Sequence, residues 1–303
     1  MKRPPLVWDP SYEIDLGPHV FVTAKYRLTR ERLLRDGIVT DEHFVRAVAA
    51  TAEELARVHT ATYLRKIDDD DFTLAERLQL EVPFSAEGRA AMILSCGGTL
   101  LAARLAIEHG AAGHLGGGFH HAYAGHGEGF CLLNDVAVAA RALVAEGVLA
   151  HMSVVDLDVH HGNGTASIFA DDPAVYTFSM HQENNYPSDK PPSDLDIGLA
   201  DGVGDEEYLD RLEEALPRAL EESGAELVLY LAGADPYEDD QLGGLSVTLE
   251  GLRRRDRAVL DAAGEREIPV AVVLAGGYAY QLEDTVAIHS GTVRELAAVT
   301  ERR

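Results

Sequence analysis

The chain has 303 residues, of which 46% are hydrophobic, so it is long enough and apolar enough to bury a sizeable core. Its 51 acidic and 26 basic residues give a formal charge of -25, which argues against binding to nucleic acid or an anionic membrane and suits cationic ligands or simple solubility. The chain has two cysteines, no apolar leader segment and no run of eighteen apolar residues. We therefore expect a reduced, cytoplasmic protein outside the membrane.

The first hundred residues are predicted to be mainly helical. Small and apolar residues occupy every side of the segment 87–109, which predicts a long, mostly buried helix. The elements expected before it are a strand at 5–8, a polar loop at 10–22, a helix at 24–37, short helices within 41–67 and a solvated acidic run at 68–71.

A run of three glycines follows the short strand that is expected after Gly110. A backbone with Gly116–Gly118 either turns sharply there or approaches another group closely. His120 and His121 come next, at the position where open α/β sheets place their ligands. A single histidine is more often structural, but an adjacent pair in this position favours a functional role.

The next segment, 128–135, leads into a helix that is expected to run to Gly147. Asn134 or Asp135 can cap the first turn of that helix with a side-chain oxygen. Phe130 is either a core residue or a wall of a pocket. Both interpretations of Phe130 stay open at this point.

A buried strand near 152–157 carries acidic residues at its end. Because side chains alternate along an extended chain, Asp156, Asp158 and His160 are predicted to share one face. Buried carboxylates are costly unless they are paired or bound to a metal, so this pattern favours a cation. The alternative is an acid that caps a helix beside a hydrogen-bonded core histidine.

Two later strands repeat this arrangement: 227–231 precedes Asp235, and 270–274 precedes Gly276 and Tyr278. Alternation of strands and helices with short connections predicts one α/β domain over residues 1–303, an open parallel sheet with helices on both faces. The other expected elements are helices at 163–170, 205–223, 248–263 and 285–299, a strand at 175–180 and a loop at 181–192.

Five motifs occur in a fixed order along the chain. They are Gly-Gly-Gly-Phe-His-His, Gly-Phe-Cys-Leu-Leu-Asn-Asp, Asp-Leu-Asp-Val-His-His-Gly-Asn-Gly, Ala-Gly-Ala-Asp-Pro and Gly-Gly-Tyr. Together they resemble the zinc-dependent histone deacetylase family, and the resemblance covers nearly the whole chain. Gly-Asn-Gly at 162–164, Asn-Tyr-Pro at 185–187 and Leu-Gly-Gly-Leu-Ser at 242–246 resemble its class IV branch and bacterial relatives. The resemblance implies the arginase/deacetylase fold.

The resemblance also implies two metal ions. Asp158, His160 and Asp235 would bind one catalytic zinc ion, and this set of three leaves room for a water and a substrate carbonyl. A structural potassium ion would lie beneath the zinc. Its implied ligands are Asp156, Ser179 and Met180, together with Asp158 and His160.

The catalytic residues follow from the same resemblance. His121 would be the general base and later the general acid, and His120, oriented by Asp156, would stabilise charge. Tyr278 would donate its hydroxyl to the developing oxyanion. Asn163 stands where class I members have an acid, and a neutral amide raises the pKa of His121 less than a carboxylate would.

The implied substrate is an acylated lysine in a peptide or protein, with acylated polyamines or other acylated amines as the alternative. A scaffold that binds acylated partners without turnover, and binuclear ureohydrolase chemistry, are weaker alternatives. The length of the acyl group stays open, because the glycines at 116–118 either leave room for a long chain or only permit the turn. The implied pocket residues are Gly118, Gly129, Phe130, Tyr186 and Gly276.

Overall fold

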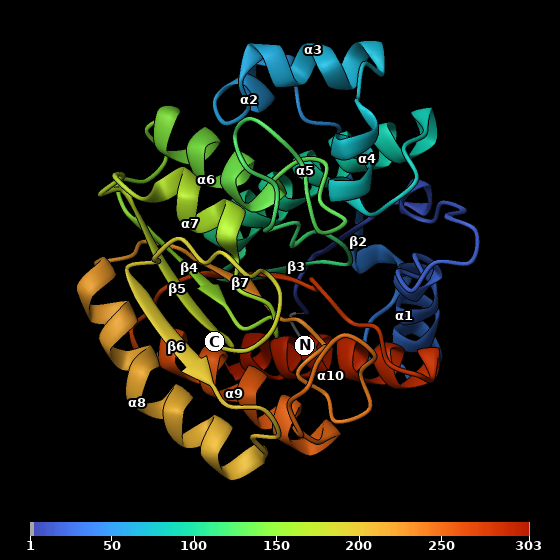
Figure 1. Ribbon diagram of the computed structural model, residues 1–303. Coiled ribbons are helices and arrows are strands. Elements are labelled where there is room, and N and C mark those ends of the chain that lie inside the picture. Colours follow the sequence, from blue (N-terminus) through green and yellow to red (C-terminus); the bar gives the residue numbers. More distant parts are fainter. Residues whose placement is uncertain (1–2, 303) are drawn as a thin grey trace.

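The computed structural model describes residues 3–302, which contain one eight-stranded sheet (Figure 1). Every pair of neighbouring strands in it is parallel, which confirms the predicted parallel sheet. In sheet order the strands are β2 (Phe44–Arg46), β1 (Leu6–Trp8), β3 (Ala111–His114), β8 (Val270–Val273), β7 (Val228–Leu231), β4 (Met152–Asp156), β5 (Val175–Gln182) and β6 (Leu195–Leu199).

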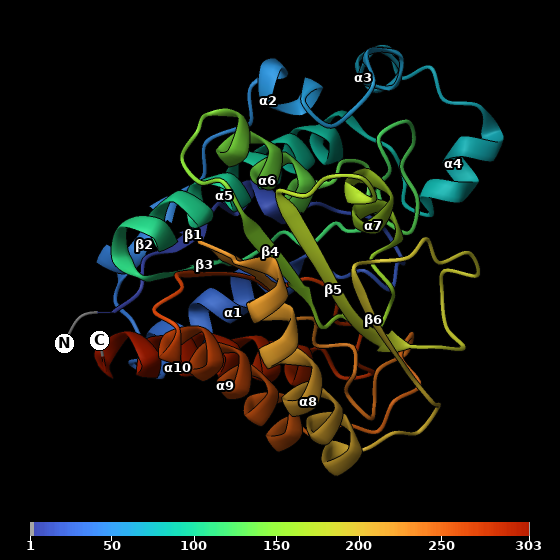
Figure 2. The same cartoon turned by 90° about the vertical axis from the view of Figure 1, so that its left-hand side faces the viewer.

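Helices cover both faces of this sheet, as Figures 1 and 2 show. Successive residues of the central strands serve two separate cores: Val155 packs with the helices on one face and Val154 with those on the other. One face carries α1 (Ala24–Arg35), α8 (Asp205–Ser223), α9 (Leu249–Glu265) and α10 (Leu282–Arg302). The other carries α5 (Ala86–His109), α6 (Asp135–Ala145) and α7 (Asn163–Phe169), with α2 (Ala52–Ala56), α3 (Ala61–Asp69) and α4 (Leu74–Leu80) outside them.

Helix α5 is long and apolar enough, by length and composition, to cross a membrane, with a mean hydropathy of 1.7. This corrects the expectation that no stretch of the chain has that character. The helix packs against α6 and against strands β3 and β8, and 61% of its most apolar window is buried inside the protein. Its composition is therefore that of a core helix, as the even distribution of apolar residues around it predicts.

Both edge strands differ from the prediction. Strand β2 lies within 41–67, where only short helices are expected, and β6 follows the predicted loop at 181–192. Strand β5 also continues into that loop as far as Gln182. Edge strands are short and partly exposed, so they lack the continuous apolar run that marks a central parallel strand.

A buried ion pair on α9 supports the loops that follow β4 and β7. The Arg255 guanidinium is fully buried and donates to the Asp256 carboxylate at 2.8 and 2.9 Å. It also donates to the carbonyl oxygens of Gly233, at 2.5 Å, and of Leu157, at 3.4 Å. The Tyr230 hydroxyl donates to Asp256 at 2.6 Å, so the carboxylate is well satisfied.

Replacing Asp256 with alanine should lower the free energy of unfolding by about 3–5 kcal/mol, because Arg255 would stay buried without its counter-charge. Urea unfolding measures this change. Asp210→Asn, an exposed substitution on α8, is the control and should change the free energy by less than about 0.5 kcal/mol. A loss below about 1 kcal/mol for Asp256→Ala would contradict the role of the pair.

Candidate active site

The predicted site residues meet at the C-terminal edge of four adjacent strands. Strands β3, β8, β7 and β4 lie side by side in the middle of the sheet, and each is followed by part of the site. Short connections after the strands bring these parts to one place. His120 and His121 follow β3, Asp156 ends β4, Asp158 and His160 follow it, Asp235 follows β7 and Tyr278 follows β8.

Asp158 and His160 do not lie on an extended strand, because β4 ends at Asp156. The chain bends there instead, and each carboxylate accepts a hydrogen bond from the backbone two residues further on. The N–H of Asp158 donates to Asp156 Oδ1 at 3.2 Å, and that of His160 to Asp158 Oδ1 at 3.0 Å. Such local bonds are typical of aspartate in turns. The side chains still converge, although by a different local structure from the predicted one.

Asp158, His160 and Asp235 form a buried cluster whose ligand atoms all lie within 4.8 Å of one another. His160 Nδ1 lies 3.1 Å from Asp158 Oδ1 and 3.5 Å from Asp235 Oδ2. Within the described residues, Asp235 Oδ2 is buried without a hydrogen-bond partner. Burial and the charge of Asp158 raise the pKa of Asp235, so a cation would relieve both carboxylates. Two carboxylates and one imidazole are donors that suit zinc, and the cluster fits that ion.

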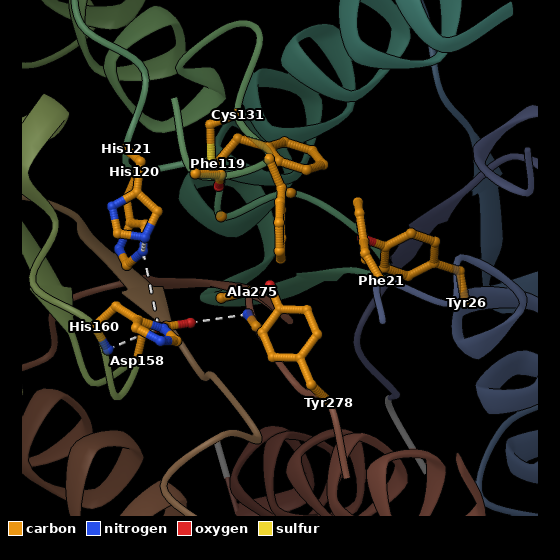
Figure 3. A pocket seen from close by; sticks show the side chains of 15 residues that line it. Phe21, Tyr26, Phe119, His120, His121, Cys131, Asp158, His160, Ala275 and Tyr278 are labelled. Atoms are coloured by element: carbon orange, nitrogen blue, oxygen red, sulfur yellow. Dashed lines mark hydrogen bonds and ion pairs between the residues drawn. The ribbon is translucent and has the colours of Figure 1, made fainter. Parts of the chain in front are cut away.

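The two histidines stand beside this cluster (Figure 3). The His120 Nδ1 proton points to Asp156 Oδ2 at 2.6 Å, His121 Nδ1 lies 2.7 Å from Asn163 Oδ1, and the two Nε2 atoms are 3.2 Å apart. Burial alone would lower the pKa of His120, but the carboxylates of Asp156 and Asp158 raise it to about 9. Burial and the positive charge of His120 lower the pKa of His121. The pair therefore combines a cationic and a neutral imidazole.

Asn163 leads to a carboxylate that the motifs do not single out. Its amide nitrogen donates to Glu128 Oε1 at 2.6 Å, and the Tyr186 hydroxyl donates to the same oxygen at 3.0 Å. Gln79 donates to Oε2 at 2.9 Å, and His126 Nε2 lies 3.2 Å from it. Burial raises the pKa of Glu128, but these hydrogen bonds lower it to about 2. The carboxylate is therefore ionised at neutral pH.

The pocket above the cluster has two parts. The inner part is a cavity of about 20 Å³ beside His121 and Tyr278, and Figure 3 shows these two side chains on opposite sides of it. The outer part is a mouth of about 430 Å³ that includes Glu81. All five predicted pocket residues line one or both parts: Gly118, Gly129, Phe130, Tyr186 and Gly276.

Close approach requires all three of these glycines, and two of them also have a positive φ. Gly118 has φ +84° and faces Ala275, and a Cβ there would lie 2.5 Å from the Ala275 Cβ. Gly129 has φ +53°, and its Cβ would lie 2.8 Å from the His121 ring and 2.9 Å from that of Tyr186. Both positions exclude a side chain by conformation and by space.

Lys25 is a part of the site that the motifs do not reveal. The side chain is fully buried, its Nζ donates to the carbonyl of Ala275 at 3.0 Å, and it lies 5.3 Å from the ring centres of Phe21 and Tyr278. Burial lowers its pKa to about 8. A weak signal exists in the sequence, since Lys25 is one of four lysines and precedes Tyr26 in a partly apolar helix.

The residues implied for potassium lie behind the cluster. Asp156 and Ser179 are paired in register on the neighbouring strands β4 and β5, and Met180 follows Ser179. This arrangement brings Asp156 and Ser179 to adjacent positions, whereas the Met180 side chain packs in the core, so Met180 could contribute only its backbone oxygen. Potassium binding itself stays a prediction.

A second group of ligand-type side chains, His161, His181 and Asp196, also lies within 4.8 Å. His161 Nε2 lies 3.2 Å from Asp196 Oδ1, and His181 Nδ1 lies 3.0 Å from Ser179 Oγ. His161 Nδ1 is buried without a partner among the described residues. A metal on Nε2 would leave a buried Nδ1 proton with no acceptor, whereas metal-bound histidines normally donate that proton. We interpret this group as hydrogen-bonded support for β6.

Known sequences and one solved structure are similar to nearly the whole of this chain. Residues 19–292 match the histone deacetylase domain. An uncharacterised protein of Picosynechococcus sp. is 42% identical over 287 residues, which cover 94% of this chain and 96% of that protein. Histone deacetylase 2 of Arabidopsis thaliana is 30% identical over 293 residues, covering 92% and 75%. The crystal structure of the HDA15 HD domain aligns with a TM-score of 0.78 at 25% identity, covering 98% of this chain and 88% of that one.

Proposed function

Because the chain belongs to the histone deacetylase family, we propose that it is a zinc-dependent hydrolase that removes an acyl group from the side-chain nitrogen of lysine. One observation carries the proposal: the Asp158–His160–Asp235 cluster, the neutral His121 and the Tyr278 hydroxyl all border a single cavity or lie directly behind it. Zinc, when bound, lowers the pKa of its water to about 7 and polarises the acyl carbonyl.

The protein's own groups supply the remaining steps. His121, neutral and with its Nδ1 beside Asn163, takes a proton from the attacking water on Nε2 and later passes it to the leaving amine. His120 stays protonated beside Asp156 and stabilises negative charge. Tyr278 donates its hydroxyl to the carbonyl oxygen as charge develops there.

The walls of the mouth suit a lysine side chain. Phe130 and Tyr186 present apolar ring surfaces, which the methylene stem of lysine can cover. Potassium bound by Asp156, Ser179 and Met180, with Asp158 and His160, belongs to the same proposal, since these residues adjoin the ligand cluster. Acylated polyamines are a second substrate class, because Glu81 adds a carboxylate to the mouth that attracts amines.

Short acyl groups should be the best substrates. A cavity of about 20 Å³ holds little more than one water-sized group, and Gly118 is packed against Ala275 rather than facing open space. We expect kcat/KM to fall at least about tenfold from acetyl- to octanoyl-lysine, because a longer chain would have to displace packed side chains.

The assay compares acetyl-, octanoyl- and myristoyl-lysine in one peptide, with acetylated polyamines in parallel, on zinc-loaded protein. Preference for octanoyl or myristoyl would contradict the short pocket. Turnover of polyamines alone would favour the second substrate class, and no turnover of either class would contradict the proposed function.

A further inference from the structure

We propose that Glu128 is a positioning residue of the active site, which fixes the amide of Asn163 and thereby the tautomer of His121. The inference deepens the proposed function and rests on it. Glu128 makes no hydrogen bond to the ligand cluster within the described chain, and its one bond to a wall of the mouth comes from the Tyr186 hydroxyl. It acts through Asn163, to which it is bonded at 2.6 Å, and Asn163 in turn lies 2.7 Å from His121.

The amide of Asn163 has two chemically different ends. One end is an oxygen that only accepts, and the other is a nitrogen that only donates. An ionised carboxylate accepts only, so Glu128 Oε1 selects the nitrogen end of Asn163. The oxygen end must then face His121, and the Nδ1 atom of His121 must carry a proton to bond with it. The other ring nitrogen, Nε2, is left free to accept a proton.

Without Glu128 this choice would not be forced. An asparagine can rotate its amide by half a turn at little steric cost, and it would then present its nitrogen to His121. That orientation favours the opposite tautomer, with the proton on Nε2. A histidine in this state cannot act as the base, and one wrong tautomer at a catalytic histidine costs activity heavily.

Glu128 is itself held firmly. Each of its carboxylate oxygens has two partners: Asn163 and Tyr186 on Oε1, Gln79 and His126 on Oε2. Its backbone N–H donates to the carbonyl of Cys131 at 3.1 Å. The carboxylate is therefore fixed from several directions and can impose an orientation on Asn163.

The Asn163 amide also keeps the negative charge of Glu128 from direct contact with His121. A carboxylate directly on His121 would favour the imidazolium form, whereas the intervening amide orients the ring without adding a charge to it. Asn163 therefore orients the His121 ring, while the negative charge stays on Glu128.

The first test replaces Glu128 with alanine in the zinc-loaded protein. We expect kcat for the acetyl-lysine peptide to fall roughly 10–100-fold, the scale for groups that orient a ligand or base, with zinc content unchanged. Nitrogen-15 spectra of labelled histidine should change from one His121 tautomer, protonated on Nδ1, to a mixture. A purely structural role would not change the tautomer.

Glu295→Ala is the matched control. Glu295 is 3% exposed and, like Glu128, accepts several hydrogen bonds, here from Arg253 and Arg257 on α9. Its loss should lower stability and leave kcat and the His121 tautomer as in the unmodified protein. If Glu128→Ala retains kcat within twofold and a single Nδ1-protonated tautomer, the inference is overturned.

Exchanging the carboxylate of Glu128 and the amide of Asn163 tests the same inference with side chains of nearly unchanged shape. Asn163→Asp alone would place two carboxylates in contact and should lose at least tenfold in kcat. Adding Glu128→Gln supplies a donor to the new aspartate, which again accepts the proton of His121, so the double variant should recover at least tenfold. No recovery in the double variant would overturn the inference. If Glu128→Ala does not fold, the comparison of Asn163→Asp with the double variant still tests the inference. Failure of the proposed function would show as no turnover by the unmodified protein, while the tautomer measurement still tests Glu128.

Discussion

Replacing Asp235 with alanine is expected to abolish zinc binding and hydrolysis together. Asp235 is fully buried, and its Oδ2, which has no hydrogen-bond partner among the described residues, lies 3.5 Å from His160 Nδ1. A catalytic zinc held by three protein ligands cannot lose one and keep its affinity. Elemental analysis should show about one zinc per chain for the unmodified protein and a background level for the variant. Zinc should also raise the melting temperature of the metal-free protein and not that of the variant.

A control must separate loss of the metal from damage to the fold. Asp205→Ala serves this purpose, because Asp205 accepts hydrogen bonds from Thr248 at the start of α9, away from the cluster. That variant should lose stability and keep its zinc. If Asp235→Ala still bound one equivalent of zinc, the assignment of the ligands would be wrong.

Replacing Tyr278 with phenylalanine is expected to lower kcat by roughly 10²–10³-fold while zinc and acyl-peptide binding persist. The substitution keeps the aromatic ring and removes only the hydroxyl. Burial and the charges of Asp158 and Asp235 raise the pKa of Tyr278, so the phenol stays protonated and can donate throughout the neutral range. The loss should therefore appear in turnover and not in affinity.

Steady-state kinetics and a direct binding measurement with zinc-loaded protein separate the two effects. Tyr280→Phe is a suitable control, since Tyr280 lies two residues further on and its side chain is 69% exposed. It should behave like the unmodified protein. Turnover by Tyr278→Phe within threefold of that level would exclude an oxyanion role for the hydroxyl.

The central part of the fold could be predicted from the sequence because its signals are local. Strands β7 and β8 are continuous apolar runs, β4 is mostly apolar and buried throughout, and helices such as α8 show clear periodicity and end at a glycine. The edge strands carry no such run. Strand β6 alternates buried Leu195 with exposed Asp196, and it is held by pairing with β5 rather than by its own composition.

The same distinction holds for the site. The acids and histidines could be found because each follows the end of a strand, and parallel strands bring their ends together. Lys25 and Glu128 could not be found in this way, since the residues that surround them lie far along the chain. Lys25 meets Ala275, and Glu128 meets Asn163 and Tyr186. Only the folded protein shows which buried charge faces which partner.

The hydrogen bonds of Arg255 bear on how the proposed zinc ion would enter and leave. One guanidinium bonds to the carbonyls of Leu157, beside Asp158, and of Gly233, two residues before Asp235. The spacing of two ligand-bearing loops is thus set by a group that belongs to the core and not by the ion. The ligands are preorganised, so the chain need not refold around each arriving ion. For the proposed zinc site we therefore expect metal exchange without refolding, so that protein stripped of zinc stays folded and regains activity when zinc is returned.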